Sequence, residues 1–134
     1  MKRKIIIPIL FLIPFSHLLG QRNVKVLSYR IDTIINNECD KWNYPTKDTL
    51  ETIISKMTPL SGEEHHGCYN NYSCDIEGEI IYKGVKYNLT LNAGGWARLV
   101  SIDYSKQFLL ACTVKKYFKY FISTKDCGGV SGAP

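Results

Sequence analysis

The sequence lacks the motifs by which metal sites and membrane anchors are usually recognised. Its 134 residues include only three histidines and five cysteines. No C-x-x-C pair and no H-E-x-x-H motif occurs, so neither of these zinc-binding patterns is present. After residue 20 no apolar stretch approaches the about 20 residues of a membrane-spanning helix. The sequence also contains no internal repeat and no linker, and we therefore expect one domain.

The chain has little net charge once its first residues are set aside. It carries 17 basic and 12 acidic side chains, a formal net charge of +5, but Lys2, Arg3 and Lys4 supply three of the basic ones. Without them, 14 basic residues face 12 acidic ones, a net charge of +2. A nucleic-acid-binding domain usually keeps a larger basic excess on one face. We therefore expect no nucleic-acid partner.

The first twenty residues carry the strongest pattern. A basic head, residues 1–4, precedes an apolar run of 15 residues over 5–19, and Gly20 ends the run before the chain turns polar. This order is typical of a secretory signal peptide. We predict a signal peptide over 1–20, no transmembrane anchor after its removal, and export to the periplasm or the medium. The exported domain is expected over 21–127, followed by a flexible Gly-rich tail over 128–134.

The five cysteines of an exported chain meet an oxidising environment, in which they tend to pair. The odd count leaves one over, and spacing does not determine the pairing. The simplest prediction joins Cys68 to Cys74 across a short polar loop and Cys112 to Cys127 near the C-terminus. Cys39 would then be free, buried or bonded to another chain.

Residues 50–57 carry the clearest helical pattern. Thr46 or Asp48 can cap the helix, and Pro59 stops it. Its apolar side chains recur at i, i+3, i+4 and i+7 and form one stripe: Leu50, Ile53, Ile54 and Met57.

Residues 75–91 alternate apolar and polar side chains about a turn at Lys83-Gly84, which predicts a hairpin with a two-residue loop. One register places all of the apolar residues on one face. It pairs Tyr82 with Val85, Ile80 with Tyr87 and Ile76 with Leu91.

The remaining segments complete a single α+β domain. Residues 21–31 read as a strand or a docked arm, and 61–73 read as an irregular loop. Residues 96–102 and 107–114 read as strands, the second one central because it is more apolar, and 115–122 reads as a last strand or a short helix. We expect an antiparallel meander of four to five strands with one packed amphipathic helix, supported by disulfides.

Asp75, Glu77 and Glu79 share the polar face of the predicted hairpin. Their cross-strand neighbours in the register above are not cations but Asn92, Thr90 and Asn88. The carboxylates are therefore expected to form an unneutralised acidic strip, either a plain solvated face or a surface that steers a basic partner. Glycoside hydrolysis needs one buried carboxyl of a pair, which a solvated strip does not supply.

Residues 63–68 place potential metal ligands close together in sequence. Adjacent histidines on an extended loop point in different directions, so we expect no metal and no cofactor there. The alternative is a zinc or copper site at His65 and His66, or a Cys-His enzyme in which Cys39 supplies the thiolate.

Part of the chain, residues 61–112, resembles small exported proteins of Gram-negative bacteria to which no activity is assigned. The resemblance implies an envelope location and transfers no activity or site. It is carried by the loop before the hairpin and by the two following turns: Ser61, Gly62, Glu63, His66, Cys68, Cys74, Gly78, Tyr82, Lys83, Gly84, Tyr87 and residues 92–95.

Some small proteins of that general kind neutralise secreted toxins, and this motivates the functional hypothesis. We expect a non-enzymatic binding protein, an immunity or inhibitor protein that sterically blocks a toxin or a cell-wall hydrolase. Trp96, Tyr69 and Tyr72 are the expected aromatic anchors, and the acidic strip is expected to speed association. A structural surface component, bridged through the odd cysteine, is the third alternative.

Overall fold

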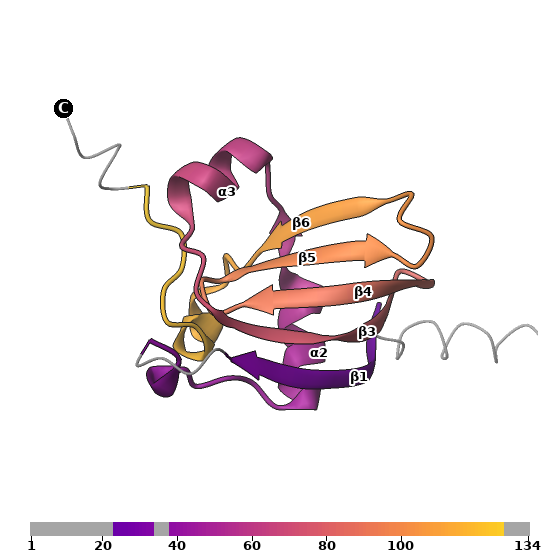
Figure 1. Cartoon of the computed structure of the whole chain (residues 1–134), viewed down its shortest axis with the longest axis horizontal. Helices are drawn as coiled ribbons and strands as arrows, with labels where there is room; N and C mark the ends of the chain where they lie inside the picture. Colours follow the sequence, from indigo (N-terminus) through magenta and orange to yellow (C-terminus); the bar gives the residue numbers. More distant parts are fainter. Residues whose placement is uncertain (1–22, 34–37, 128–134) are drawn as a thin grey trace, which may run out of the picture.

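The protein folds around one antiparallel sheet, which confirms the α+β prediction. The computed structural model describes residues 23–33 and 38–127, so the predicted signal peptide and the Gly-rich tail lie outside the described residues. The strand order is β1-β3-β4-β5-β6-β2 (Figure 1). In chain order the elements are β1 (Val24–Thr33), η2 (Cys39–Lys41), α2 (Lys47–Lys56), β2 (Thr58–Pro59), α3 (Gly62–Cys68), β3 (Cys74–Tyr82), β4 (Val85–Asn92), β5 (Trp96–Ser101), β6 (Gln107–Ala111) and η3 (Lys115–Tyr120).

The strand count of four to five is wrong, because the sheet has six strands among the described residues. The additional strand is β2, two residues that pair with Leu110 and Ala111 of β6. The structure also replaces part of the predicted loop with helix α3 and makes η3 the short helix of the two alternatives. None of the described helices is long and apolar enough to cross a membrane.

Strand β6 is not central as predicted, since only the short β2 lies beyond it. Its apolar composition has another cause, because both of its faces are covered in part. Leu110 belongs to the main core, whereas Ala111 and Leu109 belong to a second cluster on the opposite face.

The hairpin of β3 and β4 has the register predicted from its pattern. Lys83 and Gly84 both have positive φ, 50° and 81°, which suits a two-residue turn whose twist matches that of the strands. The alternation therefore directs one side of both strands into the core.

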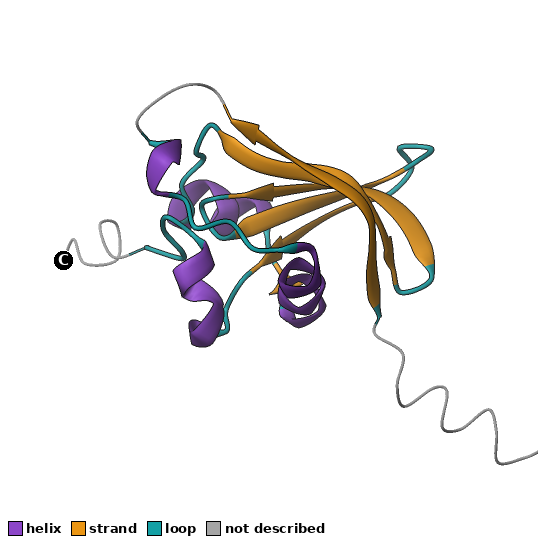
Figure 2. Cartoon of the chain, turned by 90° about the horizontal axis from the view of Figure 1, so that it is seen from below, coloured by secondary structure: helices purple, strands orange, loops and turns teal. Residues whose placement is uncertain are grey.

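Helix α2 packs on one face of the sheet (Figure 2), and its predicted stripe forms the centre of the core. Leu50, Ile53 and Ile54 are fully buried and pack among the inward side chains of the central strands. Glu51 ties the helix to the first strand, because its Oε1 accepts a hydrogen bond of 2.9 Å from the Val26 amide.

Strand β1 carries a bulge that requires a glycine on its neighbour. The register of β1 against β3 shifts between Val26 and Ser28. A Cβ placed on Gly78 would lie 2.0 Å from the Ser28 carbonyl oxygen. Only glycine allows the two backbones to approach this closely.

The cysteines pair differently from both predictions. The disulfides join Cys39 to Cys74 and Cys68 to Cys127, and Cys112 is free and buried. Cys74 begins β3 opposite Thr33, the last residue of β1, and the Cys68 carbonyl at the end of α3 accepts a 2.7 Å hydrogen bond from the Asp126 amide. These neighbours are distant in sequence, which is why spacing did not predict them.

Candidate protein-binding surface

The two ends of the sheet are built differently. One end, which we call the hairpin end, comprises residues 23–25, 82–86 and 102–108. Val24 pairs with Tyr82, and the Lys83 amide donates to the Asn23 carbonyl at 2.8 Å, so the start of β1 lies beside the β3–β4 turn. At the opposite end lie α3, η3 and the C-terminal segment (Figure 1). The disulfide to Cys127 fastens that segment to the end of α3.

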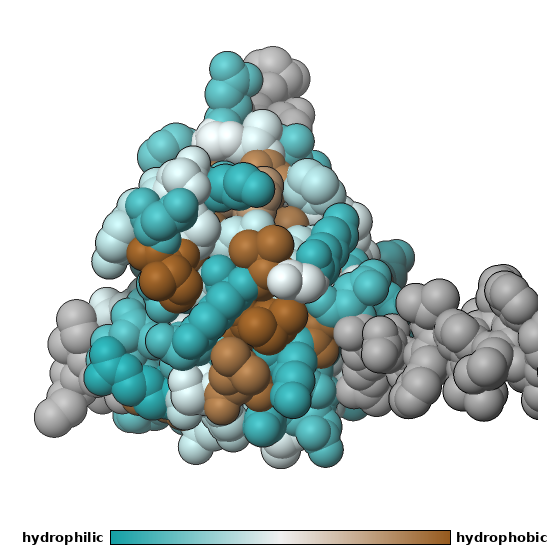
Figure 3. Space-filling view, turned by 90° about the vertical axis from the view of Figure 1, so that its right-hand side faces the viewer, coloured by the Kyte–Doolittle hydropathy of each residue, from teal (hydrophilic) through white to brown (hydrophobic). Residues whose placement is uncertain are grey.

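The hairpin end displays large apolar side chains. Figure 3 faces this side of the molecule and shows apolar side chains gathered among hydrophilic ones. Val85, Ile102, Tyr104 and Phe108 are each at least 40% exposed, and Tyr104 is 79% exposed. Such clusters of exposed apolar side chains are typical of surfaces that bind another molecule.

Tyr104 lies in the hydrogen-bonded loop between β5 and β6. Tyr104 has φ of 61°, a left-handed backbone that is uncommon for a bulky residue. Asp103 stabilises the turn through Oδ1, which accepts hydrogen bonds from Ser101 Oγ at 2.8 Å and from the Ser105 amide and Oγ at 3.0 and 2.7 Å. The bonds from Ser105 and Ser101 lower the pKa of Asp103 to about 2. The exposed ring is therefore carried by a pre-organised turn.

A groove of about 410 Å³ opens beside the hairpin end. It runs along the first part of β6, between the segment after α2 and the β3–β4 hairpin. A ladder of rings lines it, with Tyr87 4% exposed at the centre and Phe108 40% exposed at the rim. The Tyr87 ring stands edge-on to Tyr82 at 6.3 Å and to Phe108 at 5.6 Å.

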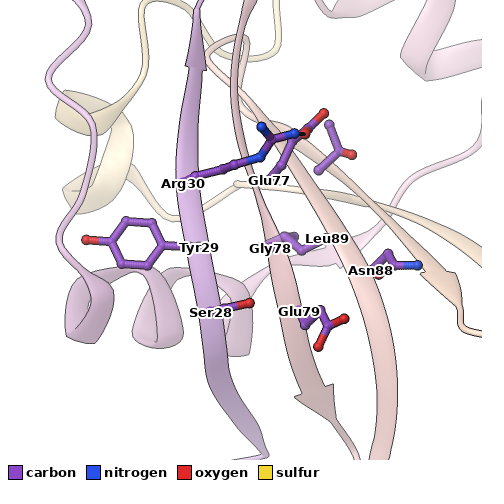
Figure 4. A pocket seen from close by; sticks show the side chains of 9 residues that line it. Ser28, Tyr29, Arg30, Glu77, Gly78, Glu79, Asn88 and Leu89 are labelled. Atoms are coloured by element: carbon purple, nitrogen blue, oxygen red, sulfur yellow. Dashed lines mark hydrogen bonds and ion pairs between the residues drawn. The ribbon is translucent and has the colours of Figure 1, made fainter.

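The predicted acidic strip lies on the other face of the sheet, beside a shallow hollow of about 450 Å³ (Figure 4). It is largely neutralised, contrary to the prediction. Arg30 of β1 binds Glu77 at 2.7 Å, and Lys86 binds Glu79 at 3.1 Å. The cross-strand neighbours were predicted correctly, but β1 adds a cation from the other side of β3, and Lys86 reaches its partner diagonally.

Asp75 is a partly exposed residue of β3 that is hydrogen-bonded to a buried asparagine. Asn92 is 2% exposed, and its Nδ2 donates to Asp75 Oδ1 and to the Tyr72 carbonyl, both at 2.8 Å. Its Oδ1 accepts from the amides of Tyr72 and Gly94. Burial raises the pKa of Asp75, although the bond from Asn92 acts in the opposite direction. These contacts order the start of β3, and the partner of Asp75 there is an uncharged amide rather than a cation.

The predicted aromatic anchors are structural in this fold. Trp96 and Tyr69 are only 6% and 7% exposed and form the second core cluster with Leu60. Trp96 Nε1 donates to the Asn70 carbonyl at 3.0 Å. Tyr72 is half-buried and packs against the main core. Since a binding anchor must lie on the surface, Trp96 and Tyr69 instead hold α3 and the following loop on the sheet.

The two adjacent histidines lie on helix α3 rather than on the predicted extended loop, with their ring centres 5.5 Å apart. His65 is 6% exposed and its ring lies 4.2 Å from the Trp96 ring, whereas His66 is exposed. Burial is the largest cause of the lowered pKa of His65, and the charges of His66 and Arg98 add to it. Within residues 23–33 and 38–127, no three His, Cys, Asp or Glu side chains are grouped to hold a metal ion.

The disulfide of Cys39 excludes this cysteine both as a nucleophile and as the odd cysteine. A disulfide-bonded Cys39 supplies no thiolate, so it is not the nucleophile of a Cys-His enzyme. The odd cysteine is Cys112, which is 2% exposed, and a buried thiol is poorly placed to bridge two chains.

No family model, no curated protein and no solved structure matches this chain. Among the described residues, the hairpin end forms the best candidate site. It is not recognisable from the sequence because its apolar residues lie in turns that are scattered along the chain. A local signal is the presence of two large apolar residues, Ile102 and Tyr104, within the short turn between β5 and β6.

Proposed function

We propose that the protein is an exported, non-enzymatic binding protein, an immunity or inhibitor protein that covers the cleft of a toxin or a cell-wall hydrolase. The observation that carries the proposal is the cluster of exposed apolar side chains at the hairpin end, with Tyr104 displayed on a hydrogen-bonded turn. Binding through pre-ordered groups is favoured, because little conformational freedom is lost on association.

The proposed mechanism is steric. The β3–β4 turn and the β5–β6 loop lie on neighbouring strands, since Tyr87 of β4 pairs with Ser101 of β5. They form one projecting edge, on which Ile102 and Tyr104 would enter the partner's cleft. Tyrosine is among the residues that most often dominate the binding energy of interfaces.

Two observations support export. Residues 1–20 have the pattern of a signal peptide. Disulfides persist mainly in oxidising compartments, and this fold has two of them. Both lie away from the hairpin end, so the cross-links support the scaffold without occupying the proposed binding surface.

The test is recovery of the partner from the cell envelope. The full chain with its own leader and a C-terminal tag is expressed in its native host, cross-linked and purified. Tyr104→Ala combined with Ile102→Ser is expected to reduce recovery of the bound protein at least tenfold, since loss of a dominant contact costs about 2 kcal/mol or more.

Tyr44→Ala is the matched control, because Tyr44 is 53% exposed and lies near η3, where the Asn43 side chain donates to the Lys119 carbonyl. The purified partner should also lose its enzymatic activity on adding the wild-type protein. Equal recovery with the double variant and with the control would contradict the proposal.

A further inference from the structure

We infer that the groove beside the hairpin end receives one large apolar side chain of the partner protein, carried on a segment rich in aspartate and glutamate. This inference rests on the proposed function and specifies the chemistry of the partner. It assigns an acidic partner surface, whereas the strip of carboxylates in the sequence suggested a basic one.

The size of the groove suits a side chain rather than a whole domain. Its volume of about 410 Å³ lies at the lower end of the about 300–1,000 Å³ that is usual for ligand pockets. Its apolar lining comes from three separate segments of the chain: Pro59 and Leu60; Tyr82, Val85 and Tyr87; and Phe108, Leu109 and Leu110.

The ring ladder provides an open position for a further apolar group. Tyr87 is held between Tyr82 and Phe108, at interplanar angles of 74° and 66°. Phe108 ends the ladder and is 40% exposed. An aromatic ring placed against it would continue the edge-to-face series, an arrangement that contributes about 0.5–1.5 kcal/mol per pair beyond the area buried.

The charges around the groove are mostly positive. Lys83 lines the groove, and its Nζ lies 5.4 Å from the centre of the Tyr82 ring. Lys25 and Lys106 are exposed at the same end, and none of these three lysines forms an ion pair with another described residue.

The nearby carboxylates cancel only part of this positive charge. Asp103, whose pKa is lowered to about 2, offsets one of the three lysines, and Glu79 is paired with Lys86, so a net positive charge remains. An approaching segment therefore meets an apolar groove with the Lys83 ammonium group at its rim, at an end of the sheet that also carries the exposed Lys25 and Lys106. Complementary acidic side chains on the partner would speed association and select against basic segments.

The probe is a fluorescein-labelled peptide with one tryptophan between two Asp-Glu pairs, and the readout is fluorescence anisotropy with the disulfide-bonded protein. One control peptide carries lysines in place of the acids, and another carries alanine in place of tryptophan. The acidic tryptophan peptide is expected to bind at least tenfold more tightly than either control, and more weakly as salt increases.

Two variants locate the site. Phe108→Ala and Lys83→Glu should each weaken binding of the acidic peptide by about tenfold, as expected for a contact of more than 1 kcal/mol. Tyr44→Ala and Lys115→Glu change an exposed ring and an exposed lysine away from the hairpin end and should leave it unchanged. Val85→Asp changes an exposed residue of the groove lining and should also weaken binding of the acidic peptide. This variant replaces Phe108→Ala in the test if Phe108→Ala lowers stability.

Absence of any preference for acidic peptides overturns the inference, as does unchanged binding to Phe108→Ala and Val85→Asp.

Flotation with phosphatidylglycerol vesicles, compared with phosphatidylcholine vesicles, tests whether the same end binds an anionic membrane. Vesicle binding without peptide binding also overturns the inference. Recovery of a partner that depends on Tyr104 but not on Phe108 or Lys83 would refute this inference and leave the proposed function standing.

Discussion

The disulfide between Cys68 and Cys127 is expected to contribute a large part of the stability. It closes a loop with a sequence separation of 59 residues. In the chain-entropy treatment of cross-links, a loop of this length stabilises the folded state by ~4 kcal/mol at 25 °C. A domain of this size has a free energy of unfolding of only about 5–15 kcal/mol. Replacing both cysteines by alanine should therefore leave the domain marginally stable.

Urea unfolding followed by tryptophan fluorescence measures this loss. Trp96 packs in the cluster beneath α3, so its emission reports directly on the affected region. With an m value of about 2 kcal/mol per M, a loss of about 4 kcal/mol lowers the urea midpoint by about 2 M. Mass mapping of the non-reduced wild type should show the same pair linked.

Cys112→Ala is the control, because it removes a buried thiol without removing a cross-link. Its cost should be about 1 kcal/mol, since little volume is lost. In the wild type, Cys112 should react with iodoacetamide only after unfolding, because burial both shields the thiol and raises its pKa. A midpoint shift in the double variant no larger than that of Cys112→Ala would refute the assigned pairing.

Three further predictions concern buried polar groups and close packing. Folding lowers the pKa of His65 from its ordinary value of 6.5, so His65 is protonated at a higher pH in the unfolded chain than in the folded protein. The free energy of unfolding should therefore be highest above pH 6.5 and decrease as the pH falls toward the lowered pKa. His65→Phe should flatten this dependence in urea titrations between about pH 5 and about pH 8. Asn92→Asp replaces two donated bonds by a charge facing Asp75 and should cost about 3 kcal/mol at neutral pH in the same assay. Gly78→Ala should cost about 2–3 kcal/mol, since its methyl group would overlap the Ser28 carbonyl.

Each of these predictions has its own control. His66→Asn, at the exposed neighbour, should reduce the pH dependence without removing it. Asn88→Asp changes a partly exposed amide on the same strand and should cost less than Asn92→Asp. Gly62→Ala, where a Cβ meets nothing within 4 Å, should leave stability nearly unchanged. Equal effects of control and test variant would show that the assigned contacts do not carry the stability.

Much of the central fold was predictable from short-range patterns. The i, i+3, i+4 spacing of Leu50, Ile53 and Ile54 placed α2, and the alternation about Lys83-Gly84 placed β3 and β4 in register. Each element must be apolar on one side in order to pack on a core, and its own repeat sets the spacing of these apolar residues. Both patterns can therefore be recognised within a short segment of sequence. The same reasoning located the candidate carboxylates on the polar face but not the cations that neutralise them.

Local patterns along the chain thus determine the amphipathic helix, the hairpin register, the antiparallel α+β class and the leader-like first twenty residues. Only the tertiary structure decides which cysteines bond, that Trp96 and Tyr69 are buried, that Arg30 reaches Glu77 and that Val85, Tyr104 and Phe108 share one end. The physical reason is range. Periodicity reflects the geometry of a single element, whereas these contacts join segments tens of residues apart. Such segments meet only when the complete sheet has formed and packed against α2.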